Sequence, residues 1–109
     1  MAGSVSTVGV VAALVAVTVS LGVVGGAVVE ARRVAGIADA AALAAADAAS
    51  GAVPGVPCER AGQVAAAGDV HLSTCDVAGL VATIMVAGAY GGISFDARSR
   101  AGPPDTPSP

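Results

Sequence analysis

The sequence predicts an α+β protein: a long N-terminal membrane-spanning helix that continues into an Ala-rich amphipathic helix, then a small helix and a three-stranded antiparallel sheet. Three observations lead to this prediction. Residues 1–29 carry no charged side chain, residues 30–50 are nearly all strong helix formers, and glycines separate three strand-like segments further on. We divide the 109 residues into a membrane segment 1–29, a helical extension 30–50, a linker 51–57, a disulfide-closed domain 58–100 and a disordered Pro-rich tail 101–109.

Residues 5–29 contain nothing more polar than Ser and Thr. At about 1.5 Å per residue a helix of this length spans about 37 Å, more than the hydrocarbon core of about 30 Å. It must be helical there, because lipid offers backbone groups no hydrogen-bond partners. A cleavable signal peptide is the main alternative, but no Lys or Arg precedes the run, and the run is longer than the core of such a peptide.

Small residues follow one another along this helix at helical spacing. Ala12, Ala16 and Ser20 recur every four positions, and Gly22 and Gly26 form a GxxxG motif. Such rows let two helices approach closely in lipid, which predicts that they contact a partner helix. The alternative is that a composition rich in Ala and Gly produces these spacings by chance.

The extension 30–50 is predicted to continue the membrane helix, ending at Ser50-Gly51 before the linker with its two prolines. Asp39 and Asp47 lie off its apolar stripe, where water can reach them. The stripe itself is narrow and consists of Val34, Ile37, Ala41, Ala44 and Ala48.

The domain 58–100 is predicted to begin with a helix over 58–67, with Pro57 at its start. Strands are expected over 70–75, 80–87 and 93–96, and the turn positions are Gly79, Gly88 and the Gly91-Gly92 pair.

Cys58 and Cys75 most simply form one disulfide, which requires an oxidising compartment. Two buried thiols remain an alternative, and a zinc site a weaker one, since no CxxC spacing is present. In an unbroken strand Cys75 would share the face of His71 and Ser73, away from a helix packed on the apolar face. We therefore expect the strand to end before Ser73.

No residues point to catalysis, a metal or another cofactor. Asp69, His71 and Ser73 alternate on one strand face, but neighbours there are about 6.6 Å apart, too far for a triad. Asp39 and Asp47 are separated on a solvated helix. The small size argues against an enzyme with a deep cleft for a small-molecule substrate. The net charge of −3 and the absence of Lys argue against a nucleic-acid binder.

The order of these features resembles the TadE/TadG-like proteins of tight-adherence (Flp-type) pilus systems. The similarity is greatest to the actinobacterial group called helicase/secretion-neighbourhood TadE-like proteins. The resemblance covers residues 3–103 and is carried by Gly-Ser-Val-Ser-Thr before an apolar helix, by ARRVAGIADAAALAAA, by the two cysteines and by ARSRAGP. It implies a pilin-like fold and a non-enzymatic minor-pilin-like component that assembles with other pilin-like or Tad-type proteins through its N-terminal helix.

The resemblance also implies that the C-terminal part is outside the cytoplasm, in agreement with a disulfide. Arg32 and Arg33 argue for the opposite orientation by the positive-inside rule. Pilin-type precursors are cut after a Gly, which here is Gly3, leaving Ser4 first. Val8 then stands where the family commonly carries Glu, and this departure argues against the pilin packing in which Glu neutralises a neighbour's terminal amine.

Relatives usually begin with a short charged stretch, so one hypothesis is that translation starts upstream with basic residues. Mass spectrometry of the native N-terminus would reject it on finding Met1 or Ala2. Two further functions stay open at the level of sequence. One is a signal-anchored or secreted disulfide domain that binds an envelope ligand or partner, and the other is a small membrane protein of holin or regulatory type.

Overall fold

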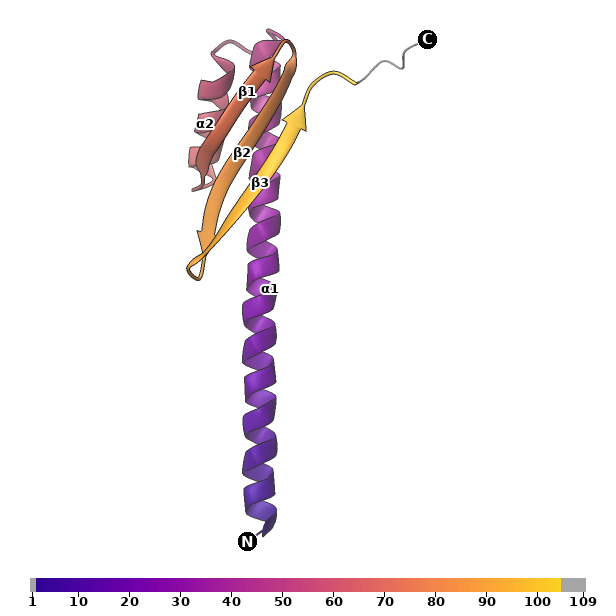
Figure 1. The fold of residues 1–109 in the computed structure, drawn as a ribbon, viewed down its shortest axis with the longest axis vertical. Helices are drawn as coiled ribbons and strands as arrows, with labels where there is room; N and C mark the ends of the chain where they lie inside the picture. Colours follow the sequence, from indigo (N-terminus) through magenta and orange to yellow (C-terminus); the bar gives the residue numbers. More distant parts are fainter. Residues whose placement is uncertain (1, 105–109) are drawn as a thin grey trace. The chain divides into compact units, whose positions relative to one another are not determined.

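The computed structural model describes residues 2–104, and within them two helices precede a three-stranded antiparallel sheet of order β1-β2-β3 (Figure 1). The predicted α+β class is confirmed. The chain divides into two compact units, residues 1–30 and 31–109. Residues 105–109 of the predicted tail lie outside the described residues. The elements are α1 (Ala2–Ala49), α2 (Pro57–Ala67), β1 (His71–Ala78), β2 (Val81–Tyr90) and β3 (Ile93–Ala101).

The first unit is the N-terminal part of α1, and three of its hydroxyl side chains bond to the backbone of the same helix. Hydroxyl groups that bond to the backbone of their own helix do not need a partner from lipid. This explains how Ser and Thr are accommodated in the apolar run. Three hydroxyls donate to the carbonyl four residues earlier at 2.8 Å: Thr7 to Gly3, Thr18 to Leu14 and Ser20 to Ala16.

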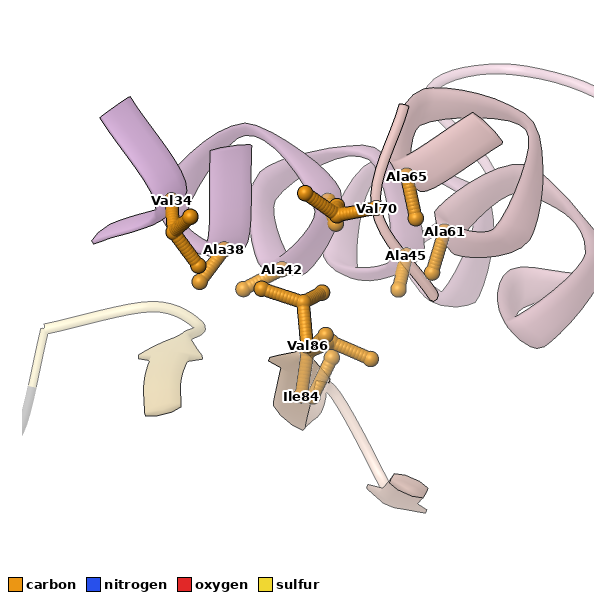
Figure 2. Close-up of a cluster of buried hydrophobic side chains, with 11 residues drawn as sticks. Val34, Ala38, Ala42, Ala45, Ala61, Ala65, Val70, Ile84 and Val86 are labelled. Atoms are coloured by element: carbon orange, nitrogen blue, oxygen red, sulfur yellow. The ribbon is translucent and has the colours of Figure 1, made fainter. Parts of the chain in front are cut away.

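The second unit has its core between one face of the sheet and the two helices that cover it, α2 and the part of α1 from Ala31 (Figure 2). Seven of its eleven buried hydrophobic residues are alanines. Alanine side chains let α1 approach β2 and α2 closely, so this core gains its packing from short distances rather than from large side chains. The buried residues are Val34, Ala38, Ala41, Ala42, Ala45, Ala61, Ala65, Val70, Ala82, Ile84 and Val86.

The buried face of α1 differs from the predicted stripe. Val34 and Ala41 are fully buried as expected, but Ile37, Ala44 and Ala48 are only partly buried. The fully buried set also includes positions that the stripe left out, namely Ala38, Ala42 and Ala45. Two elements pack against this part of the helix, and a helix covered on two sides buries a wider arc than a single i, i+3, i+7 row.

A bulge in β1 overturns the prediction that this strand ends before Ser73. The strand runs on to Ala78, and its pairing with β2 shifts between Leu72 and Thr74, so that Ser73 is an extra residue. An extra residue inverts the side-chain alternation beyond it. Cys75 consequently shares the half-buried face with Leu72 and Val77, toward the helices, and the disulfide does not have to pass around the sheet edge.

The sequence predicted a turn at Gly88. This prediction is wrong, because Gly88 lies inside β2. A Cβ at this position would stand 3.0 Å from Cγ2 of Val34 and 3.2 Å from Cγ1 of Val70. A side chain at this position would crowd both valines, so glycine suits the close approach of α1 to the strand. The predicted turns at Gly79 and Gly91-Gly92 are confirmed, and all three glycines have positive φ, between 58° and 80°.

The linker is held to the helix that follows it. Arg60 of α2 donates from Nε and Nη2 to the carbonyl oxygen of Pro54, at 3.0 and 2.7 Å. Gly55, with φ +124°, leaves the space that this guanidinium needs, because a Cβ there would lie 2.8 Å from Nε. The linker is thus attached to the first turns of α2 through Pro54.

Candidate functional site

The most unusual surface of the protein is the apolar side of α1 in the first unit. One helix in the described residues is long and apolar enough to cross a membrane, and none of its most apolar 18-residue window is buried. The core helix of a soluble protein would be largely buried, so this exposure favours lipid as the surroundings of the helix. The large side chains that stand more than half exposed include Val5, Val8, Leu14, Leu21 and Val24.

The predicted small residues lie on one side of this helix. With 3.6 residues per turn, Gly22 and Gly26 form one row and Ala12, Ala16 and Ser20 an adjacent row, and together they cover less than half of the circumference. The hydroxyl of Ser20 bonds to its own helix and leaves only a small side chain on the surface. Two further small residues, Gly9 and Ala13, precede Ala16 and Ser20 at coiled-coil spacing and were not among the predicted contact residues.

Gly3 and Ser4, the predicted processing site, lie in the first turn of α1. The carbonyl oxygen of Gly3 accepts a hydrogen bond from the hydroxyl of Thr7, and the side chain of Val8 is 68% exposed. A cut after Gly3 would remove less than one turn and leave the apolar run intact.

Cys58 and Cys75 are joined in a disulfide, with Cα atoms 5.9 Å apart. The bond ties the first turn of α2 to the middle of β1. Cys75 is half buried against the core, so the disulfide holds α2 next to the core on the β1 side of the sheet.

Polar contacts fasten α1 to the rest of the second unit. Arg33 donates from Nη1 to the carbonyl oxygen of Gly68 at 2.6 Å, and the hydroxyl of Ser99 on β3 donates to Oδ1 of Asp39. The carboxylate of Asp39 is therefore exposed to water and also links α1 to β3. Arg33 has a structural role at the junction of α2 and β1, which gives a reason for a basic residue here that is independent of membrane topology.

Asp69, His71 and Ser73 do not form a triad-like arrangement on a regular strand. Asp69 precedes β1 with φ +58°, His71 opens the strand, and Ser73 is the bulge residue. Within residues 2–104, no three His, Cys, Asp or Glu side chains are grouped so that they could hold a metal ion. The same part of the chain contains no buried polar or charged residue.

In comparisons with models of protein families, with curated proteins and with solved structures, nothing matches this chain. The physical properties of α1 and of the disulfide-closed second unit are therefore the basis for a function.

Proposed function

We propose that this chain is a non-enzymatic, membrane-anchored minor-pilin-like component of a Tad/Flp-type pilus or a related secretion apparatus. The observation that carries the proposal is that the two parts of α1 have different surroundings. As a single helix from Ala2 to Ala49, it has an exposed apolar part without charge up to Val29 and a buried part from Val34 that forms one wall of an α+β core. Such a helix can join a membrane anchor to a folded domain.

Assembly is proposed to occur through the small residues of the first unit. Apolar side chains gain little by leaving lipid for one another, so helices in a bilayer associate where small residues allow close packing. Gly22, Gly26, Ala12, Ala16 and Ser20 offer such rows, and the exposed side chains of Val19 and Val23 lie between them on the same side of the helix. The proposed partners are other pilin-like or Tad-type proteins with helices of the same kind.

The second unit is proposed to lie outside the cytoplasm, with α1 as a single-pass anchor in the cell membrane. The disulfide supports this orientation, because structural disulfides persist in oxidising compartments. Arg32 and Arg33 support the reverse orientation by charge alone, but the hydrogen bond from Arg33 to Gly68 gives this arginine a second role within the unit.

A C-terminal tag on the full chain tests the anchor and its orientation. We expect the protein in the membrane fraction, with the tag digested by protease added to intact cells from which the cell wall has been removed. The anchored domain would thereby be distinguished from a secreted ligand-binding domain, which would appear in the medium. A tag protected until the membrane is permeabilised would contradict the proposed orientation.

Replacing both Gly22 and Gly26 with Leu should weaken helix association roughly three- to tenfold, because two large side chains then separate the backbones. The measurement is the yield of crosslinked partner in native membranes. Val17→Leu with Val24→Leu is the matched control, since these exposed residues lie opposite the glycine row on the same helix. Equal yields from both double variants would mean that the glycine row is not a contact surface.

A further inference from the structure

The turn between β2 and β3 carries an exposed apolar tip. Tyr90 and Ile93 face each other as the last paired residues of the two strands, and they are 38% and 57% exposed. Between them, Gly91 and Gly92 both have positive φ, 58° and 80°, as the tight two-residue turn of a twisted hairpin requires. We call residues 90–93 the hairpin tip.

The hairpin tip is also the uncharged end of its hairpin. Residues 86–95 contain no charged side chain. On β3 the charges begin at Asp96, about 10 Å from Ile93 along the strand, and continue with Arg98 and Arg100. Arg98 and Arg100 are exposed, whereas the tip offers water only a phenol, an isoleucine side chain and two glycines. Such a pattern suits contact with a partner that is apolar where it meets the tip and polar where it meets the rest of β3.

Packing within the second unit shows at which end the hairpin tip lies. At the start of β2, Leu80 lines a groove together with Leu43, Ala46 and Ser50, near the C-terminal end of α1. At the other end of β2, Gly88 lies against Val34. The strand therefore runs antiparallel to α1, and two further residues bring Tyr90 about 7 Å beyond Val34, toward Ala31.

The chain enters this unit at Ala31, two residues after Val29, the last residue of the apolar run. The hairpin tip therefore lies at the end of the second unit where the chain enters it, and only a short stretch of chain separates that end from the residues proposed to be embedded, whichever side of the membrane the unit occupies. Tyrosine suits the headgroup region of a membrane because its ring is apolar and its hydroxyl polar. We propose that Tyr90 and Ile93 bind the phospholipid surface beside α1, as a second contact that restricts tilting of the domain. This inference rests on the proposed membrane anchor.

Tryptophan fluorescence tests the contact in the full-length protein, because the chain contains no Trp. Each single-tryptophan variant is reconstituted in vesicles of phosphatidylcholine and phosphatidylglycerol, with and without bromine on the upper part of the acyl chains. Tyr90→Trp supplies the tip reporter. Leu80→Trp supplies the turn reporter. It is a matched control, because Leu80 is exposed in the turn between β1 and β2, at the other end of the sheet. Leu14→Trp supplies the anchor reporter. Circular dichroism checks each fold, and Ile93→Trp supplies the tip reporter if Tyr90→Trp is unfolded.

Brominated lipid should quench the tip reporter and the anchor reporter strongly and the turn reporter hardly at all, whereas acrylamide in the water should quench the turn reporter most. Equal weak lipid quenching of the tip and turn reporters, with the anchor reporter quenched, would overturn the lipid contact and leave the anchor standing. Shielding of the tip reporter from both quenchers would also overturn it and would indicate a protein partner at the tip. Absence of lipid quenching at the anchor reporter would instead refute the membrane anchor.

Discussion

Ala42→Leu should destabilise the second unit by about 2 kcal/mol, within the range of about 1–3 kcal/mol seen when a large side chain is forced into a packed core. Ala42 is fully buried on α1, and Ile84 and Val86 of β2 project toward this part of the helix (Figure 2). Leucine at this position must push the helix from the sheet or take a strained rotamer. Both changes would disturb a core in which alanines set the separation of the elements.

Ala40→Leu is the control, because residue 40 lies on the same stretch of α1 with its side chain in water. We expect this variant to unfold like the wild type, since leucine and alanine differ little in helix propensity. Hydrogen exchange of the β2 amides in detergent micelles measures the opening of the second unit without interference from the apolar part of α1. Equal protection in the two variants would mean that the alanine contacts are loose.

The long apolar helix α1, the helix α2 and the three strands can be predicted from the sequence, because each has a strong local signal. Charge is absent up to Glu30, Pro57 stands at the first position of α2, and Gly79 and Gly91-Gly92 occupy turns with positive φ. These signals depend on single residues or on the period of one element. They require no knowledge of what packs against that element.

The face of β1 and the role of Gly88 could not be predicted, because both depend on contacts between distant segments. The bulge at Ser73 is visible only in the pairing of β1 with β2. A glycine in an apolar run signals either a turn or a close approach, and only the position of Val34 decides between them. The true buried face of α1 likewise depends on β2 and α2, which both pack on it.

Assembly and orientation depend on surfaces whose counterparts are other molecules. The rows that include Ala16 and Gly22 are exposed in the single chain, and their packing requires a second helix. The sequence pattern therefore predicts which face is suited to contact, and the crosslinking and tagging experiments determine whether it is used.

Replacing Cys58 and Cys75 together by Ser should lower the stability of the second unit by about 3 kcal/mol, the loop-entropy value for a closed loop of this size. The loss is large for this domain, since alanine side chains bury little apolar area and leave a small net stability. The double variant avoids leaving one free thiol. In the absence of reductant, the β2 amides of the variant should be less protected from hydrogen exchange than those of the wild type. The apolar part of α1 should remain helical in both proteins.

Reductant distinguishes a loss of the cross-link from a loss of side-chain packing. Reduced wild type should lose protection by about the same factor as the double serine variant, and the variant should not respond to reductant. Cysteine and serine are similar in size, and Cys75 is only half buried, so the packing difference between the two reduced forms is expected to be small. Equal protection of oxidised wild type and the serine variant would mean that the bond between α2 and β1 adds nothing to the stability of the core.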